Sequence, residues 1–230
     1  MISAVIVAGG SGLRMQACVR KQYLILKDRP ILAHTLLAFD GCPVLERMVL
    51  VVPEADLSAC RDGIVAPLKL THDLELVSGG RRRQESVLKG LSALGGGGIT
   101  MIHDGVRPFV RAALLDRLVA GVRETGACIP VVAATDTLKQ VDAHGRVVGT
   151  LDRRRIRLAQ TPQTFFTDLI RPAHREAAQA GYRATDDAAI AEFAGAPVTV
   201  VPGDRDNIKI TTPEDLEVAR TILDRWHDHP

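Results

Sequence analysis

Residues 4–24, AVIVAGGSGLRMQACVRKQYL, contain a glycine-rich segment followed by two permanent cations. An apolar run leads into residues that suit an anionic ligand: Gly9, Gly10, Gly12, Arg14 and Lys21. Backbone N–H groups that a ligand can approach closely, together with fixed positive charge, are suited to polyphosphate. The spacing lacks the GxxxxGK[ST] pattern of P-loop hydrolases, and Met15 stands where a dinucleotide fingerprint has its third glycine. A glycine-rich turn with solvated cations is the alternative interpretation.

A second candidate group follows another apolar run, in the segment HDGVRPFV. Asp104 lies just past the apolar run of residues 99–102, and Arg107 follows three positions later. In open α/β sheets, ligands bind at the carboxyl ends of the strands. A carboxylate in that place suits Mg²⁺, which completes its coordination with phosphate and water. Asp104 is therefore a candidate magnesium ligand, and the alternative is turn or cap chemistry ahead of Pro108.

Two further segments carry glycine or charge where a ligand could bind. In SGGRRRQESV, Gly79, Gly80 and Ser86 could shape a pocket for a base or a phosphate. The three arginines of that segment are interpreted as a solvated face. In GDRDNIKITTPEDLEVA, Lys209 precedes a helical segment, and Asp206 is a possible second metal ligand.

Short β-branched runs alternate with amphipathic segments along most of the chain. The expected strands are residues 4–7, 48–52, 74–77, 100–103, 129–132 and 198–201. The expected helices are residues 83–94, 111–126, 168–180, 186–194 and 213–226. Continuous apolar runs are typical of strands that are buried on both faces. The alternation predicts an α/β fold with a Rossmann-like, mostly parallel sheet and helices on both faces.

The segment 136–157, DTLKQVDAHGRVVGTLDRRRIR, departs from this pattern, because two alternating runs flank DAHG. The spacing predicts a β-hairpin with its turn at His144 and Gly145. An isolated hairpin is only marginally stable in water, so we expect this one to lie against its own domain or against a second subunit. We favour a protruding dimerisation arm on a single domain that spans residues 1–230.

Composition excludes several other classes of protein. A formal net charge of +2 is too close to neutral for a nucleic-acid partner, and no apolar run is long enough to span a membrane. The segment MISAVIVAGG lacks the basic region of a signal peptide. The four cysteines form no CxxC pair, so neither a zinc site nor a disulfide framework is indicated. Reduced thiols in a cytoplasmic protein are the expectation.

Taken together, the motifs resemble the 2-C-methyl-D-erythritol 4-phosphate cytidylyltransferases of the non-mevalonate isoprenoid pathway. The resemblance runs in order from residue 2 to about 220, through AVIVAGGSGLRM, KQYL, GGRRRQESV, HDGVRP, DTLK, LDRRRIRLAQTPQTF, ATDDA and DNIKIT. It implies a nucleotidyltransferase-type sheet and a Mg²⁺-dependent reaction of CTP with 2-C-methyl-D-erythritol 4-phosphate. The products would be 4-diphosphocytidyl-2-C-methyl-D-erythritol and pyrophosphate.

The resemblance also implies roles for the residues that match the family's motifs. Arg14 and Lys21 would stabilise charge on the α-phosphate, and Asp104 would bind Mg²⁺. Arg153 and Lys209 would serve both catalysis and acceptor binding, with Arg153 reaching into the neighbouring subunit's site. The residues implied for CTP are Ala8, Gly9, Gly10, Gly12, Gly79, Gly80 and Ser86. The residues implied for the acceptor are Arg107, Thr137, Arg153, Thr161, Thr185 and Lys209.

Two positions depart from the family pattern, and two other functions stay open. Arg20 stands where proline usually precedes the lysine of KQY, which would make the loop less rigid or add charge near the triphosphate. Gly105 stands where alanine is commoner, which would loosen the backbone around CTP. The first alternative function is a cytidylyltransferase for another polyol phosphate, such as D-ribitol 5-phosphate. The second is a non-catalytic nucleotide-binding protein.

Overall fold

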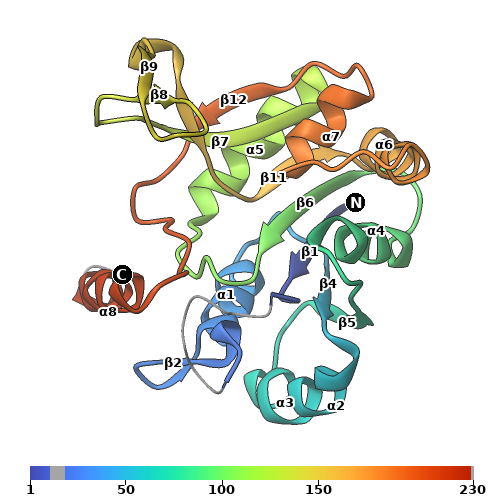
Figure 1. The fold of residues 1–230 in the computed structure, drawn as a ribbon. Helices are drawn as coiled ribbons and strands as arrows, with labels where there is room; N and C mark the ends of the chain where they lie inside the picture. Colours follow the sequence, from blue (N-terminus) through green and yellow to red (C-terminus); the bar gives the residue numbers. More distant parts are fainter. Residues whose placement is uncertain (11–18, 229–230) are drawn as a thin grey trace.

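The structure of the chain is a computed structural model, which describes residues 1–10 and 19–228. The strands of its main sheet are β1 (Ile2–Val7), β4 (Arg47–Val52), β5 (Asp73–Ser78), β6 (Ile99–Asp104), β7 (Ala127–Ala133), β10 (Arg157–Ala159), β11 (Gln163–Phe166) and β12 (Thr199–Pro202). They form an eight-stranded sheet in the order β10-β7-β11-β6-β1-β4-β5, and β12 also pairs with β7 (Figure 1). All six expected strands are present, whereas β10 and β11 were not expected.

Most pairs in this sheet are parallel, as the sequence predicts. Strand β1 lies parallel to β4 and β6, β4 lies parallel to β5, and β12 lies parallel to β7. The exceptions are β10 and β11, which run antiparallel to their neighbours. Val7 at the end of β1 pairs with Val51 and with Asp104 at the ends of β4 and β6. The loops that follow these three strands therefore leave the sheet at one edge.

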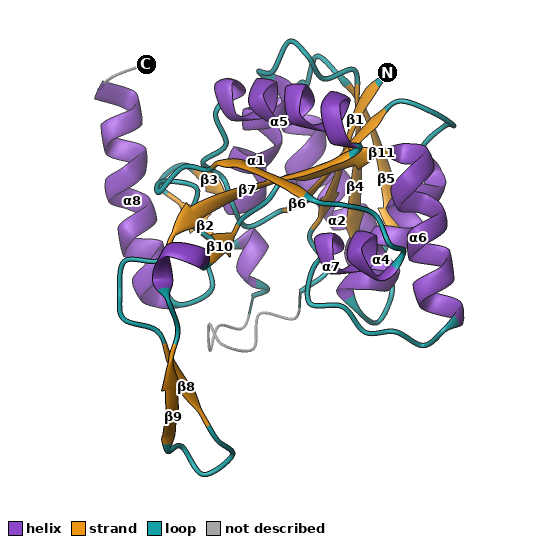
Figure 2. Ribbon diagram, turned by 90° about the horizontal axis from the view of Figure 1, so that it is seen from above, coloured by secondary structure: helices purple, strands orange, loops and turns teal. Residues whose placement is uncertain are grey.

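Helices cover both faces of the sheet (Figures 1 and 2). One face carries α1 (Ile31–Asp40) and α5 (Ala112–Thr125), and the other carries α4 (Arg83–Ala93), α6 (Thr167–Gln179) and α7 (Asp187–Phe193). Side chains of β1 alternate between the two cores: Ala4 and Ile6 face α1 and α5, whereas Val5 and Val7 face α4. Both faces of β1 are therefore buried, so the strand requires a continuous apolar run. This confirms the prediction of strands that are buried on both faces.

The remaining elements lie at the ends and edges of this core. Helix α8 (Pro213–Asp228) packs with Leu26 of β2 (Ile25–Leu26) in a third apolar cluster that includes Phe109, and β2 pairs with β3 (Arg29–Pro30). The segment between β4 and β5 holds a 3₁₀ helix (Glu54–Asp56), α2 (Leu57–Cys60), a π-helix (Arg61–Val65) and α3 (Ala66–Leu68). Further 3₁₀ helices lie at Lys21–Tyr23 and Arg153–Arg155. Among the described residues, none of the helices could span a bilayer.

Strands β8 (Lys139–Val141) and β9 (Val147–Thr150) form the hairpin that the alternating pattern predicts. Its turn is closed by the Asp142 carboxylate, which accepts hydrogen bonds from the backbone N–H groups of His144 and Arg146, and Gly145 has a φ of +77°. Figure 2 shows the hairpin projecting away from the rest of the chain. Val141, Val147 and Val148 are each more than half exposed. A role for the hairpin as an arm between subunits stays a prediction.

Candidate active site

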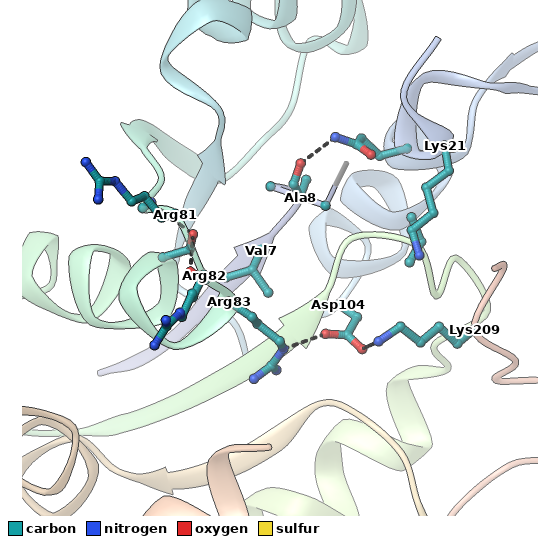
Figure 3. A pocket seen from close by; sticks show the side chains of 14 residues that line it. Val7, Ala8, Lys21, Arg81, Arg82, Arg83, Asp104 and Lys209 are labelled. Carbon is teal, nitrogen blue, oxygen red and sulfur yellow. Dashed lines mark hydrogen bonds and ion pairs between the residues drawn. The ribbon is translucent and has the colours of Figure 1, made fainter. Parts of the chain in front are cut away.

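A cavity of about 340 Å³ lies where β1, β5 and β6 end. Its volume is within the range of small-molecule sites, and its place at the carboxyl ends of parallel strands is typical of α/β proteins. Figure 3 shows that its side chains come from segments far apart in the sequence. The structure brings together eight of the residues singled out from the sequence: Ala8, Gly9, Gly10, Lys21, Gly80, Ser86, Asp104 and Lys209.

One wall of the cavity is built around Ser86, in the first turn of α4. The Ser86 hydroxyl accepts a hydrogen bond from the Gly80 N–H (3.0 Å) and donates one to the Arg82 carbonyl (3.1 Å). A Cβ atom on Gly80 would lie only 2.4 Å from Cβ of Glu85, so the close return of the chain requires glycine there. Glu85 in turn accepts from the Arg81 N–H (2.9 Å), close to the geometry of a capping box. The predicted pocket residues thus also fix the start of α4.

The opposite wall carries Lys21, which lies at the start of a short 3₁₀ helix. Its neighbour Gln22 is 1% exposed, and its side-chain N–H donates to the Ala8 carbonyl at 2.6 Å. This hydrogen bond ties the Lys21 segment to the end of β1, so the lysine is held next to the glycine-rich backbone. Gln22 was missed as a positioning residue, although it stands in the middle of the KQY motif. Gly12 and Arg14 lie outside the described residues.

Arg20, which stands in place of the usual proline, does not line the cavity. Its Nε lies 3.0 Å from Oδ2 of Asp56, and that same oxygen accepts a hydrogen bond from the Tyr23 hydroxyl, also at 3.0 Å. In the described geometry Arg20 is thus paired with Asp56, and extra charge near the triphosphate stays a prediction. Arg20 instead clamps the two ends of the Lys21 segment onto the 3₁₀ helix after β4.

Replacing Arg20 with alanine is expected to lower kcat up to about fivefold, because a partly exposed ion pair is worth at most about 1 kcal/mol. Replacing it with proline is expected to leave kcat close to that of the unaltered chain, since φ at Arg20 is −60° and proline fixes φ near this value. Steady-state turnover of both variants checks this. Unchanged turnover of R20A would contradict the clamp, and an R20P variant slower than R20A would contradict compensation by the fixed φ of proline.

Asp104 is the acidic residue of the cavity, and three cations surround it. Arg83 Nε lies 3.0 Å from Oδ1, Lys209 Nζ lies 2.8 Å from Oδ2, and Arg107 Nε lies 3.8 Å from Oδ2. Burial alone would raise the pKa of the Asp104 carboxyl, but the positive charges of Arg83, Lys209 and Arg107 outweigh it and hold the pKa well below its usual range. The carboxylate is therefore ionised at any pH at which the protein would be assayed.

The backbone at Asp104 is fixed by a buried hydrogen-bond chain. The Thr161 hydroxyl accepts from the Asp104 N–H (3.2 Å) and lies 3.0 Å from Nδ1 of His103, whose Nε2 lies 3.0 Å from the Arg107 carbonyl. Because a carbonyl only accepts, Nε2 carries the proton and Nδ1 accepts from Thr161. Burial lowers the pKa of His103 to about 3, so the ring stays neutral. Thr161 therefore supports the end of β6 directly below the cavity.

The segment that carries Lys209 is held by Arg107 and Asn207. Arg107 donates to the Asn207 carbonyl (2.7 Å), and the fully buried Asn207 side chain donates to the Thr161 carbonyl (2.8 Å). The Ile210 N–H also donates to the Val106 carbonyl (3.0 Å). These contacts connect the loop before α8 to the loop after β6, which places the Lys209 ammonium on Asp104.

Gly105 allows the same loop to lie close to β1. A Cβ atom at this position would lie 3.0 Å from Cβ of Ala8 and 3.2 Å from Cδ1 of Leu32. The Gly105 N–H donates to the Val7 carbonyl at 2.9 Å. The glycine therefore brings the backbone after β6 into close contact with the backbone after β1, instead of only loosening it.

Asp206 is occupied elsewhere in the structure. Its carboxylate lies 2.9 Å from Nη2 of Arg225 and 3.4 Å from Nη2 of Arg111, and it accepts from the Trp226 indole at 3.3 Å. The Arg111 guanidinium also lies over the Trp226 ring, 4.6 Å from its centroid. Asp206 thus anchors α8 and does not line the cavity. Within residues 1–10 and 19–228, no group of three or more potential metal ligands is present.

The structure does not bring every implied acceptor residue to this cavity. Of the implied acceptor residues, all of which lie in the described part of the chain, Lys209 alone is among the lining residues. Arg107 and Thr161 lie next to Asp104 without lining the cavity, and Thr137, Arg153 and Thr185 are exposed. The Arg153 side chain donates to the Thr135 carbonyl at 2.8 Å, at the base of the hairpin. Gly79, which was expected in the nucleotide pocket, follows β5 directly and supports Gly80, with its N–H donating to the Val52 carbonyl (2.7 Å).

The residue that sequence reasoning missed most clearly is Arg83. Figure 3 shows Arg83 directed at Asp104, whereas Arg81 and Arg82 point away from it. The run of three arginines gives no sign of this difference. A usable signal was the expected helix at 83–94, which Glu85 at its third position supports. The side chain of the third arginine, Arg83, then projects from a rigid first helical turn and not from a solvated loop.

Comparisons with known proteins agree with this geometry. The sequence model of the family described as IspD, 2-C-methyl-D-erythritol 4-phosphate cytidylyltransferase, matches residues 2–225. A curated protein of that name from Syntrophus aciditrophicus is 46% identical over 223 residues, which cover 96% of this chain and 95% of the relative. Another from Geobacillus kaustophilus is 44% identical over 221 residues and covers 96% of each.

Solved structures give the same result for the fold. The 4-diphosphocytidyl-2C-methyl-D-erythritol synthase from Anaerococcus prevotii superposes with a TM-score of 0.85 at 32% identity, over 97% of this chain and 98% of that one. The 2-C-methyl-D-erythritol 4-phosphate cytidylyltransferase from Thermus thermophilus gives a TM-score of 0.78 at 31% identity, over 96% and 98%. The nucleotidyltransferase-type fold and the family predicted from the motifs are both confirmed. The chain belongs to the 2-C-methyl-D-erythritol 4-phosphate cytidylyltransferase family.

Proposed function

We propose that the cavity of this cytidylyltransferase binds CTP and 2-C-methyl-D-erythritol 4-phosphate together and joins them through the α-phosphate of CTP. The observation that carries this proposal is the convergence of Lys21, Asp104 and Lys209 on glycine-rich backbone at the carboxyl edge of the sheet. The acceptor's phosphate oxygen attacks the α-phosphorus, the bond to the β-phosphate oxygen breaks, and pyrophosphate leaves with the electron pair. The product is 4-diphosphocytidyl-2-C-methyl-D-erythritol, for isoprenoid precursor synthesis.

Catalysis of this reaction rests on positioning and on charge, with no side-chain nucleophile. The acceptor phosphate is already anionic at neutral pH, and phosphoryl-type transfer leaves the protein little covalent work. Lys21 lies in the wall of the cavity, where its ammonium would stabilise the charge that develops on the α-phosphate. We assign the same role to Arg14. The nucleotide would be held by Ala8, Gly9, Gly10, Gly12, Gly79, Gly80 and Ser86.

The acceptor would bind on the Lys209 side of the cavity. Lys209 and Arg107 are held rigidly by the loop before α8, and both carry charge suited to a phosphate dianion. Lys209 would also orient the attacking oxygen, since its ammonium is a compact cation that lies next to Asp104. The other residues assigned to the acceptor are Thr137, Arg153, Thr161 and Thr185.

Asp104 is suited to share a magnesium ion with the nucleotide. Its two oxygens already contact Arg83 and Lys209, yet an ionised carboxylate has further lone pairs available for a metal. Because Mg²⁺ commonly takes one or two carboxylates and completes its shell with phosphate oxygens and water, one acidic residue is sufficient here. When bound, the ion would neutralise part of the triphosphate charge.

We further propose that the hairpin β8–β9 joins two copies of the chain and carries Arg153 into the partner's site. Its exposed valines, Val141, Val147 and Val148, are suited to burial against another protein surface.

We also assign the enzyme to the cytoplasm. The three described cysteines are buried free thiols, and burial raises the pKa of Cys60 to about 11, so they are structural and unreactive.

Mixing two inactive variants tests the shared site. Neither Lys21→Ala nor Arg153→Ala should be active alone, but subunit exchange should restore about a quarter of the unaltered activity. Half of the dimers in an equal mixture are mixed, and each mixed dimer has one complete site of two. Subunit exchange is followed by native mass spectrometry. If mixed dimers form and no activity returns, Arg153 does not act across subunits.

Pyrophosphate release by the purified chain tests the proposed reaction. The assay offers CTP against the other nucleoside triphosphates, and 2-C-methyl-D-erythritol 4-phosphate against D-ribitol 5-phosphate, each with Mg²⁺. We expect release only with CTP and the methylerythritol phosphate. A preference for ribitol phosphate would keep the mechanism and change the pathway, whereas no release from a folded protein would favour the nucleotide-binding alternative.

A further inference from the structure

Arg83 connects the cavity to a second, buried carboxylate that the reaction itself does not use. Its Nε donates to Asp104 (3.0 Å), and its Nη2 donates to Oδ2 of Asp187, the first residue of α7 (2.8 Å). Behind Asp187, Nε2 of His174 on α6 lies 3.2 Å from Oδ1, although it makes no well-aligned hydrogen bond. Three charged or titratable groups thus lead from the cavity wall into the interior.

The inner two members of this chain are deeply buried. Asp187 is 1% exposed and His174 is fully buried, whereas the Arg83 side chain keeps 30% of its surface. Burial would raise the pKa of Asp187, but the charge of Arg83, with a smaller contribution from His174, outweighs it and lowers the pKa. Burying an ionised carboxylate costs free energy of folding unless a positive charge is paired with it. Asp187 therefore requires Arg83 as its counter-ion.

Helix capping does not account for the Asp187 carboxylate. The N–H groups of Asp187 and Ala188 donate to the Gln163 side-chain oxygen (2.8 and 2.9 Å). The Ala189 N–H donates to the carboxylate of Asp186, the N-cap residue (3.0 Å). The first N–H groups of α7 are therefore already bonded, and both oxygens of Asp187 are directed to Arg83 and His174 instead.

We propose that Asp187, backed by His174, is a positioning residue that holds Arg83 in the single orientation in which Arg83 fixes Asp104. A guanidinium that is bonded on its Nε and Nη2 edge by two carboxylates cannot turn without breaking both bonds. Asp104 is thereby fixed as well, and with it the Lys209 ammonium at 2.8 Å. This inference rests on the proposed function, because it concerns the alignment of the same site.

The test compares Asp187→Asn with Asp186→Asn in the whole 230-residue chain. Asparagine at 187 keeps the shape of the side chain but loses its charge on Arg83, and we expect kcat to fall between about tenfold and a hundredfold, as for other misplacements of a reacting group. KM for CTP should change less than about threefold, because the nucleotide-binding backbone is not touched. Asp186→Asn keeps a good N-cap, makes no contact with Arg83, and should retain kcat within about twofold.

A double-mutant cycle separates positioning from simple loss of stability. In an Arg83→Gln background, Asp187→Asn should lower kcat by less than about twofold further, since the residue through which it acts is gone. Independent losses that multiply, or equal kcat values for Asp187→Asn and Asp186→Asn, would overturn the proposal. Turnover of the unaltered enzyme in the same assay reports separately on the proposed function.

A second readout does not depend on activity or on the folding of the Arg83→Gln variant. The Nε–H signal of Arg83, observed by ¹⁵N NMR, should exchange slowly with solvent in the unaltered chain and in Asp186→Asn. It should exchange at least about tenfold faster in Asp187→Asn, since one of its two anchors is lost. Equal exchange rates in all three proteins would contradict the proposed restraint on Arg83.

Discussion

Replacing Lys21 with alanine is expected to lower kcat by about a thousandfold while the fold is retained. The ammonium lies in the wall of the cavity, and the developing charge on the α-phosphate is the species that it would stabilise. Removal of one such preorganised donor commonly costs between about a hundredfold and a thousandfold in turnover, and a cation at a transferring phosphate can be worth more. Binding of CTP should weaken far less, because the backbone of the glycine-rich segment is unchanged.

The matched control for this variant is Lys27→Ala. Lys27 is six residues further along the chain, forms an exposed ion pair with Asp224 and does not line the cavity. Turnover of Lys27→Ala should stay within about twofold of the unaltered chain, since exposed ion pairs contribute little. Single-turnover kinetics at saturating CTP measures the chemical step directly. Near-normal turnover of Lys21→Ala, with its thermal transition unchanged, would contradict the assigned role.

The fold could be predicted from the sequence to the extent that its strands are continuous apolar runs. The runs at 48–52 and 100–103 each became a strand buried on both faces, within one residue of the expected bounds. Strand β11 was missed, because QTFF is short, mixes polar and apolar side chains, and is paired antiparallel between β6 and β7. Helix α1 was missed for a related reason: ILAHTLLAFD is apolar nearly all round, since it is covered on several sides.

Site residues could be predicted only where residues close together in the sequence contribute to the same site. Glycine next to a cation, or a carboxylate directly after a strand, indicates phosphate or metal chemistry through local spacing. Asp187 and His174 give no such indication, because their partner Arg83 is 104 residues from Asp187 along the chain. Likewise, the role of Arg20 depends on Asp56, on the far side of β4. Pairings of this kind are decided by tertiary packing, which no local pattern contains.

Replacing Asp104 with asparagine is expected to lower kcat between about a hundredfold and a thousandfold, without raising KM for either substrate at saturating Mg²⁺. Arg83, Arg107 and Lys209 all form ion pairs with the Asp104 carboxylate. Its loss therefore removes the negative charge that these three cations share in the cavity. Those cations remain available to the anionic substrates, and binding need not weaken. The geometry that the carboxylate imposes on Lys209 is lost, however, and transition-state stabilisation depends on that geometry. A fall in kcat at constant or lower KM is therefore the signature of Asp104.

The comparison that completes this prediction is Asp206→Asn, measured over a range of Mg²⁺ concentrations. Asp104→Asn should raise the Mg²⁺ concentration required for half-maximal turnover about tenfold or more, because one carboxylate ligand would be lost. Asp206 is bonded to Arg225 and Trp226 and anchors α8, so Asp206→Asn should lower the melting temperature slightly and leave the Mg²⁺ requirement unchanged. Equal Mg²⁺ requirements for Asp104→Asn and the unaltered chain would show that Asp104 acts only as the counter-ion of its three cations. In that case the metal would be held by the nucleotide phosphates alone, and the carboxylate would serve the reaction through Lys209.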